Sequence, residues 1–280
     1  MGLLVTTKNK EQIYDTDLHL FIKNVEVSAP SLETSLSKVR GRNGQINYGS
    51  THIAKTIVIT AWLFSKDEER QAVDRDRIYD VFSDEEPFYI TELFDRELYR
   101  YERPGETTGF QLVDLERSKY AYRCRYYVLA SSEPKVEFIG RHEGGFISDV
   151  SIELQTAELP YGESLPRNEI VQNGVIPYRG TARCSQLESP FTLKATAQKD
   201  GKDATFTIQD RTLVYTGSYK KNDVLEFNGV SNLQNAVNIN DKTNYEYFIL
   251  AKDSRNQNTV STNKPDDFIL EVVGYKELYK

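Results

Sequence analysis

The sequence predicts a mainly β protein that folds as two domains. A chain of 280 residues is long enough for two domains that each bury an apolar core. Its 18 Tyr and 13 Phe residues recur with Val, Ile and Thr in short segments, which suits pleated strands better than helices. From 159 to 183, Pro and Gly interrupt the chain repeatedly, as is typical of a connection between domains. We therefore expect an N-terminal domain over residues 1–160, a linker over 161–175 and a C-terminal domain over 176–280.

The N-terminal domain is expected to be a β-sandwich with one helix. Alternation of residue character is clearest at 151–154 and at 120–126, a pattern that indicates strands with two different faces. The predicted strands of this domain are 18–27, 54–64, 88–94, 109–115, 121–130, 135–139 and 146–154.

A helix over about residues 66–82 interrupts these strands. Ser65 is placed to cap it, and Glu68, three residues later, would complete a capping box. The body of the segment is strongly charged, so only a narrow face is available for packing. Its apolar stripe consists of Val73, Ile78, Val81 and Phe82.

The C-terminal domain is predicted to be a second β-sandwich. Strands at 191–196 and 204–208 flank Asp200 and Gly201, a dipeptide typical of a tight hairpin. Turn signals recur every 8 to 15 residues along this half of the chain, as in β-sandwiches. Its further predicted strands are 212–216, 224–227, 245–251 and 268–279.

Residue types that carry catalysis are few and poorly placed for it. His19, His52 and His142 have no spacing typical of a nucleophile or metal site. We expect a structural role for His19 in its strand and a turn after His142. The acidic run 84–86 has no visible partners for a metal and is expected to be a solvated loop. We therefore predict no enzyme activity, no cofactor and no metal.

Cysteine content, charge and hydropathy limit the possible redox state, ligands and location of the protein. Cys124 and Cys184 are too few for a disulfide framework and are expected to be reduced thiols. Residues 1–160 carry 20 Lys/Arg against 27 Asp/Glu, which disfavours nucleic acid as a bound ligand but is compatible with an acidic channel through which DNA passes. No apolar run approaches the length of a membrane span, and the N-terminus has no signal-peptide core. We therefore expect that the protein does not insert into a membrane. We expect it to assemble in a cytoplasm.

Aromatic residues in the second domain raise an alternative, because aromatic rings can stack on sugars. Tyr215, Tyr219, Tyr245 and Tyr247 are the candidates, although the domain has no Trp and no His. Core or interface positions are the commoner role for such tyrosines. A carbohydrate-binding adhesin acting through the C-terminal domain therefore stays open beside a structural role.

A succession of motifs resembles the distal tail protein (Dit) family of long-tailed bacteriophages (siphophages). It begins with the loop 39–45, Val-Arg-Gly-Arg-Asn-Gly-Gln, and continues through the Ile-rich strand 55–61 to the charged helix. Phe82 and the segment 87–90, Pro-Phe-Tyr-Ile, complete it. At the second domain, 177–182 and 274–280 resemble the opening and closing strands of the galectin-like domain found in short family members.

The resemblance implies a structural role at the tail tip of a virion. It implies a homo-hexameric ring, alone or stacked on another ring, in which N-terminal domains surround a channel for DNA and galectin-like domains point outward. The ring is expected to assemble in the cytoplasm of a bacterial host. The expected partners are the major tail or tube protein, the tail-associated protein and the receptor-binding protein. The galectin-like domain lacks the sugar-stacking Trp of true galectins. We therefore expect it to act as an adhesive scaffold that contacts other proteins.

Ring closure requires an interface between neighbouring copies. An extended segment can add to the sheet of a neighbour through main-chain hydrogen bonds, and the long loop 40–51 is the natural donor. The predicted subunit contacts are Arg40, Gly41, Arg42, Asn43, Gly44 and Tyr48.

Overall fold

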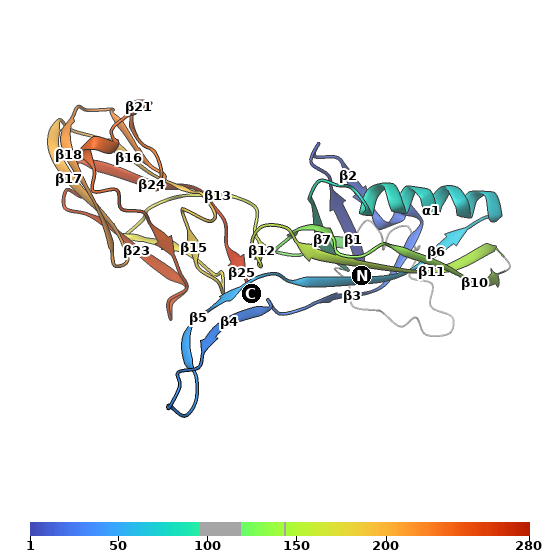
Figure 1. The fold of residues 1–280 in the computed structure, drawn as a ribbon. Helices are drawn as coiled ribbons and strands as arrows, with labels where there is room; N and C mark the ends of the chain where they lie inside the picture. Colours follow the sequence, from blue (N-terminus) through green and yellow to red (C-terminus); the bar gives the residue numbers. More distant parts are fainter. Residues whose placement is uncertain (96–118, 143) are drawn as a thin grey trace, which may run out of the picture. The chain divides into compact units, whose positions relative to one another are not determined.

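The computed structural model describes residues 1–95, 119–142 and 144–280 (Figure 1). Most of the described chain is in strands, so the predicted mainly β class is confirmed. The chain divides into an N-terminal unit, Met1–Gly162, and a C-terminal unit, Glu163–Lys280.

The N-terminal unit is built on one antiparallel sheet of nine strands. Along its main path the strands follow the order β2-β1-β7-β9-β11-β6-β3, with β8 paired to β7 and β10 paired to β11. Contacts between β1 and β3 show that the sheet curls round a shared core, rather than forming two separate sheets. The strands are β1 (Gly2–Thr6), β2 (Gln12–Tyr14), β3 (Leu20–Val27), β6 (Thr56–Ser65), β7 (Phe88–Asp95), β8 (Lys119–Ala121), β9 (Tyr126–Ala130), β10 (Lys135–His142) and β11 (Gly145–Thr156).

Alternation along the strands separates an inner face from an outer face. On β6, Ile57, Ile59, Ala61 and Leu63 are fully buried, as expected where successive side chains point to opposite faces. Helix α1 (Glu68–Phe82) covers part of the inner face. Its buried Phe82 meets Phe88 edge to face, with ring centroids 6.1 Å apart.

The N-terminus of α1 differs from the prediction. The N-cap is Asp67, whose carboxylate accepts a hydrogen bond of 2.8 Å from the backbone N–H of Arg70. The expected cap, Ser65, is instead the last residue of β6, and its hydroxyl donates to Asp74 at 2.8 Å. The predicted capping box was therefore wrong, because the strand continues to Ser65 and the first carboxylate after it takes the capping position.

Most predicted strands of this unit occur, with shifted ends. Of the predicted strand 121–130, residues 126–130 form β9 and only Ala121 belongs to β8. Strand β3 begins at Leu20 because His19 has a left-handed backbone, φ 54°, at the end of the 3-10 helix η1 (Asp15–Leu18). The expected strand at 109–115 lies outside the described residues.

Two larger sheets form most of the C-terminal unit. One has six strands in the order β13-β24-β16-β19-β20-β21, and the other has four in the order β14-β23-β17-β18. The strands are β13 (Arg167–Ile170), β14 (Val175–Pro177), β16 (Thr192–Ala197), β17 (Gly201–Ile208), β18 (Arg211–Tyr219), β19 (Val224–Phe227), β20 (Asn232–Gln234), β21 (Val237–Asn238), β23 (Gln257–Thr262) and β24 (Phe268–Tyr275). The shorter elements are β12 (Gly162–Glu163) at the boundary, β15 (Cys184–Ser185), the 3-10 helix η2 (Asn240–Lys242), β22 (Ile249–Leu250) and β25 (Leu278–Tyr279).

Aromatic side chains join the two sheets of this unit. Phe206 of β17 packs against Phe227 and Phe268 of the other sheet, with centroid distances of 5.0 and 5.2 Å. Tyr219 of β18 also packs on Phe268, at 4.7 Å. All four rings are buried, so the unit is a β-sandwich with an aromatic core.

The predicted hairpin at Asp200 and Gly201 was wrong. Strand β16 before the turn pairs with β24 and β19, whereas β17 after it pairs with β18 and β23. The turn therefore passes from one sheet to the other. The segment 161–175, expected to link the domains, contributes β13 to the six-stranded sheet, where it pairs with β24.

Buried polar groups hold the end of the chain in the C-terminal unit. Glu277 is 1% exposed, and its carboxylate accepts hydrogen bonds from the Arg179 backbone N–H at 3.0 Å and from the Tyr279 hydroxyl at 2.7 Å. Lys276 lies 2.8 Å from a carboxylate oxygen of Glu163. Both cysteines are buried and neither is in a disulfide, Cys124 in the first unit and Cys184 in the second.

Candidate subunit interface

A two-stranded hairpin extends from the nine-stranded sheet of the N-terminal unit (Figure 1). Its strands, β4 (Leu32–Ser37) and β5 (Ile46–His52), pair only with each other among the described residues. All of β4 is exposed. A hairpin of two strands is only marginally stable in water, so this element lacks a layer to pack against within the described unit.

The hairpin presents apolar side chains to solvent. Tyr48 is 67% exposed, Leu32 58% and Leu36 52%, and Val39 and Ile53 are also exposed. Contiguous exposed apolar surface on a folded protein indicates an interaction site. The hairpin is therefore the first candidate for a subunit contact.

The charge of the hairpin differs from that of the rest of the N-terminal unit. No acidic residue occurs between Glu33 and Asp67, while Lys38, Arg40 and Arg42 lie at or near the tip. The hairpin is thus a basic element on an acidic unit, and acidic partner surfaces would attract it.

Several hydrogen bonds fix the base of the hairpin. The Ser31 backbone N–H donates to the Ala54 carbonyl at 2.7 Å, and the Ser31 hydroxyl donates to the same carbonyl at 3.1 Å. The ammonium of Lys55, a buried residue, donates to the Ser28 carbonyl at 3.0 Å. Burial lowers the pKa of this ammonium. The arm is thus anchored at its base while its strands remain exposed.

The predicted contact residues gather at the end of this arm. Arg40, Gly41, Arg42, Asn43 and Gly44 form the exposed tip between the strands, and Tyr48 lies on β5. Gly41 and Gly44 both have φ 83°, a left-handed conformation that glycine adopts without steric cost. The loop expected over 40–51 is in part strand β5, which the sequence reading missed.

A second exposed apolar surface was not predicted. Phe21 of β3 and Trp62 of β6 are register partners whose rings stack at 5.9 Å. Phe64 meets Trp62 edge to face at 6.5 Å. These residues, which we call the aromatic patch, are 57%, 39% and 46% exposed. On β6, Trp62 and Phe64 alternate with buried residues and so lie on the outer face, where polar residues are normally found. This alternation is the sequence signal that could have revealed the patch.

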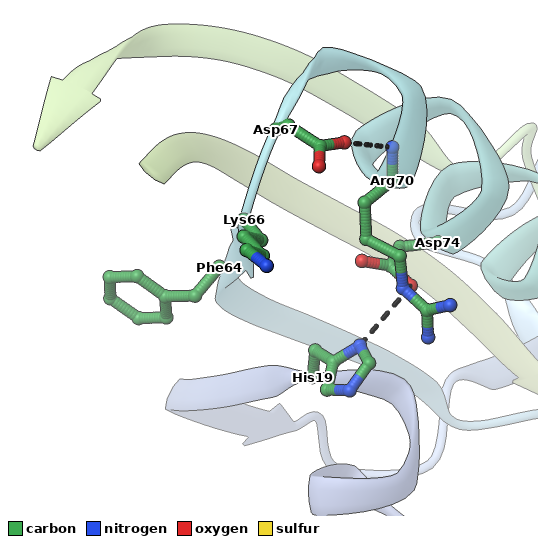
Figure 2. Close-up of a pocket in the computed structure, with 6 residues that line it drawn as sticks. All are labelled: His19, Phe64, Lys66, Asp67, Arg70 and Asp74. Carbon is green, nitrogen blue, oxygen red and sulfur yellow. Dashed lines mark hydrogen bonds and ion pairs between the residues drawn. The ribbon is translucent and has the colours of Figure 1, made fainter. Parts of the chain in front are cut away.

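A hollow of about 370 Å³ beside α1 is lined in part by His19, whose ring contacts a buried carboxylate (Figure 2). His19 Nδ1 lies 3.1 Å from Asp74 Oδ1, and Arg70 Nε lies 3.0 Å from the same oxygen. Ser65 occupies the other oxygen. Asp74 is 2% exposed, so these partners compensate a buried carboxylate and attach the helix to β6. Lys66 and Asp67 complete the charged lining, with Phe64 at its edge.

The remaining candidates for chemistry are dispersed. His52 meets Tyr161 edge to face at 5.9 Å, and Glu86 of the acidic run forms an ion pair with Lys8 at 2.5 Å. His142 ends β10. Within the described ranges, no group of three or more His, Cys, Asp or Glu side chains could hold a metal ion.

The tyrosines considered for sugar binding separate into two pairs. Tyr215 and Tyr219 are buried in the sandwich. Tyr245 is 68% exposed, and the Arg211 guanidinium lies over the Tyr247 ring at 4.2 Å. One ring of the four is therefore plainly open to solvent.

Comparisons with known proteins agree with this architecture. Residues 16–154 match the family model described as phage tail protein RIFT-related domain. The chain is similar in fold to the crystal structure of SPP1 Dit (gp 19.1), described as a paradigm of hub adsorption apparatus in phages infecting Gram-positive bacteria. That match has 11% identity, covers 99% of each chain and has a TM-score of 0.62.

More distant matches are to the phage p2 baseplate in its activated conformation. The strontium form matches at 8% identity over 96% of this chain and 97% of that chain, and the calcium form matches at 11% identity over the same shares. Both have a TM-score of 0.38. No curated protein sequence matches.

The N-terminal unit thus belongs to the phage tail protein RIFT-related domain family, and the chain is a structural phage tail protein. With the fold of the whole chain, this confirms the resemblance to the distal tail (Dit) proteins of siphophages. No helix among the described residues is long and apolar enough to cross a membrane.

Proposed function

We propose that this chain forms a homo-hexameric ring at the tail tip, in which the β4–β5 hairpin of each copy contacts the next copy. The ring joins the tail tube to the tail-associated and receptor-binding proteins, and the chain acts without catalysis. The observation that carries the proposal is the hairpin itself, an anchored basic arm whose apolar residues are exposed.

The physical argument starts from the cost of leaving the arm in solvent. Burying apolar surface contributes roughly 25 cal/mol per Å², and a specific interface buries about 1,000 Å² or more. Leu32, Leu36 and Tyr48 are large side chains that gain this contribution only when a partner covers them. A ring of identical copies supplies such a partner for every arm.

A deletion tests the arm. Removing residues 41–49 is expected to leave folded monomers, because the deleted residues pack on no core of the described unit. Native mass spectrometry would show six-membered rings for the parent chain and monomers for the deletion. A matched control is the double substitution Val230→Ala and Val237→Ala, which alters two exposed apolar residues of the C-terminal unit. Rings that survive the deletion would assign the contact elsewhere.

Passage of DNA through the ring belongs to the same proposal. Surplus acidic residues in the N-terminal unit would line a channel that repels the phosphate backbone. Replacing channel-facing acids by Lys is expected to slow DNA ejection without loss of the ring. Unchanged ejection would argue against this use of the charge.

The alternative is a carbohydrate-binding adhesin, which the exposed ring of Tyr245 favours. A glycan array probed with the full chain and with Tyr245→Ala separates the two. Glycan binding that is lost in the variant would support the adhesin. The structural proposal expects no binding by either protein.

A further inference from the structure

The hairpin and the aromatic patch lie at opposite ends of one ribbon of two strands. β3 and β6 pair from Leu20 with Leu63 to Val27 with Ile57. Beyond Val27 and Ile57 the same two chain segments continue into the hairpin (Figure 1). Phe21 and Trp62, which are paired, lie at the far end. A hairpin that extends the ribbon away from the patch does not reach the patch of its own chain.

This arrangement favours a head-to-tail contact between copies. Two different surfaces at the two ends of one element form a heterologous interface when copies associate, and a heterologous interface closes into a ring after a fixed rotation. An isologous pair, by contrast, would require each surface to match itself. Two basic tips would repel one another in that arrangement.

The outer face of the sheet has a net charge opposite in sign to that of the hairpin. Glu26 and Glu153 are both register partners of Val58, so the three lie on one face. Asp149 and Glu137 are register partners of each other on the same face, next to Trp62. Two basic residues lie on this face. Lys23 forms an ion pair with Asp149, and Lys135 is the register partner of Ser151. Exposed acids on this face therefore outnumber bases by four to two, opposite in sign to the hairpin.

From these observations we infer that the outer face of β3, β6 and β11 in one copy receives the β4–β5 hairpin of the next copy. The aromatic patch covers Leu36, Val39 and Tyr48 of the incoming arm, while Glu26 and Glu153 attract its basic tip. This inference rests on the proposed ring and names the surface that completes it.

Photo-crosslinking tests the assignment without assuming a register. The variant Tyr48→p-benzoylphenylalanine is prepared with and without ¹⁵N, mixed, assembled and irradiated. Peptides joined between the two isotopic forms report contacts between different copies. The expected products join residue 48 to peptides of β3, β6 or β11. A matched control places the probe at Val73, an exposed residue of α1, and is expected to give no product with the outer face.

The outcomes separate the inference from the function on which it rests. Rings that form while residue 48 cross-links to the C-terminal unit or to α1 would overturn the acceptor face and leave the ring in place. Chains that stay monomeric in native mass spectrometry would overturn both.

Substitutions in the patch give a second readout. Phe21→Thr and Phe64→Thr keep a strand-forming residue at each position and are expected to raise the concentration for half-maximal ring assembly at least tenfold. Val214→Thr likewise places Thr at an exposed apolar position, on β18 of the C-terminal unit, and is expected to leave assembly unchanged. Unchanged assembly in both patch variants, with unaltered thermal unfolding, would contradict the inference.

Discussion

In the β4–β5 hairpin Leu36 and Tyr48 are exposed, whereas in the C-terminal sandwich Phe206 and Phe227 have no exposed surface. Both regions consist of short antiparallel strands with apolar residues. They differ in whether a second layer is present. The sandwich supplies its own facing sheet, and the hairpin has none among the described residues.

The difference separates stability from assembly. Apolar residues that pack inside a unit stabilise that unit in the monomer. Apolar residues on an exposed arm contribute only when another surface covers them. The two kinds of position are therefore expected to respond to substitution in different measurements.

The largest expected effect is in the sandwich core. Phe206→Ala removes a ring that contacts Phe227 and Phe268 and is expected to lower the free energy of unfolding by about 3–5 kcal/mol. Leu36→Ala on the hairpin should change it by less than about 0.5 kcal/mol. Urea denaturation of the monomeric chain measures both. A comparable loss in Leu36→Ala would show that the hairpin packs within its own chain.

A smaller loss is expected from the buried carboxylate of the C-terminal unit. Glu277→Ala leaves the Arg179 N–H and the Tyr279 hydroxyl without their acceptor, which costs about 1–3 kcal/mol. The control Glu188→Ala removes an exposed carboxylate of the same unit. Equal melting temperatures for the two variants would remove Glu277 from the stabilising contacts.

Alkaline pH should weaken the sandwich through its buried tyrosines. Burial raises the pKa of Tyr275 to about 12, while an unfolded tyrosine has a pKa of about 10. Above pH ~10 the unfolded chain loses this proton and the folded chain keeps it, so stability falls as pH rises from ~10 to ~12. The slope is about 1.4 kcal/mol per pH unit for one tyrosine. Tyr275→Phe should remove that part of the slope in denaturation curves at pH 9 to 11.5, and an unchanged slope would contradict the shift.

The smallest effect belongs to the hairpin tip. Gly44 has φ 83° and open space around the position of a Cβ atom, so Gly44→Ala introduces backbone strain of about 1 kcal/mol and no clash. Global unfolding should be unchanged. Hydrogen exchange of the β5 amides should become faster in the monomer. Slower exchange in the variant would mean that the turn is not the source of hairpin order.

The sequence was most informative where periodicity and composition agreed. The charged helix and the strands 54–64 and 146–154 occur at or near the predicted positions as α1, β6 and β11. The two strands alternate buried and exposed residues over a long stretch. In α1 the buried residues recur every four positions, at Asp74, Ile78 and Phe82, although Val73 of the expected apolar stripe is exposed. The loop expected over 39–45 contains the tip of the hairpin, where Gly41 and Gly44 adopt the left-handed conformation.

Features set by distant contacts could not be predicted in this way. Asp200 and Gly201 have the composition of a hairpin turn, but β24 and β18 outcompete the local pairing of β16 with β17. Ser65 has the composition of a helix cap, but pairing with Phe146 keeps it in β6. The aromatic patch was not predicted because the exposure of a ring depends on which other segments pack over it. The residues of one strand do not specify that packing.

Burial of both cysteines has a consequence for the life of a particle. Desolvation raises the pKa of the Cys124 and Cys184 thiols, so both stay protonated and shielded from oxidants at neutral pH. Neither thiol is available to cross-link one copy to another. Moving from a reducing to an oxidising medium would therefore leave the covalent state of an assembly of these chains unchanged, and its cohesion would depend on non-covalent contacts alone.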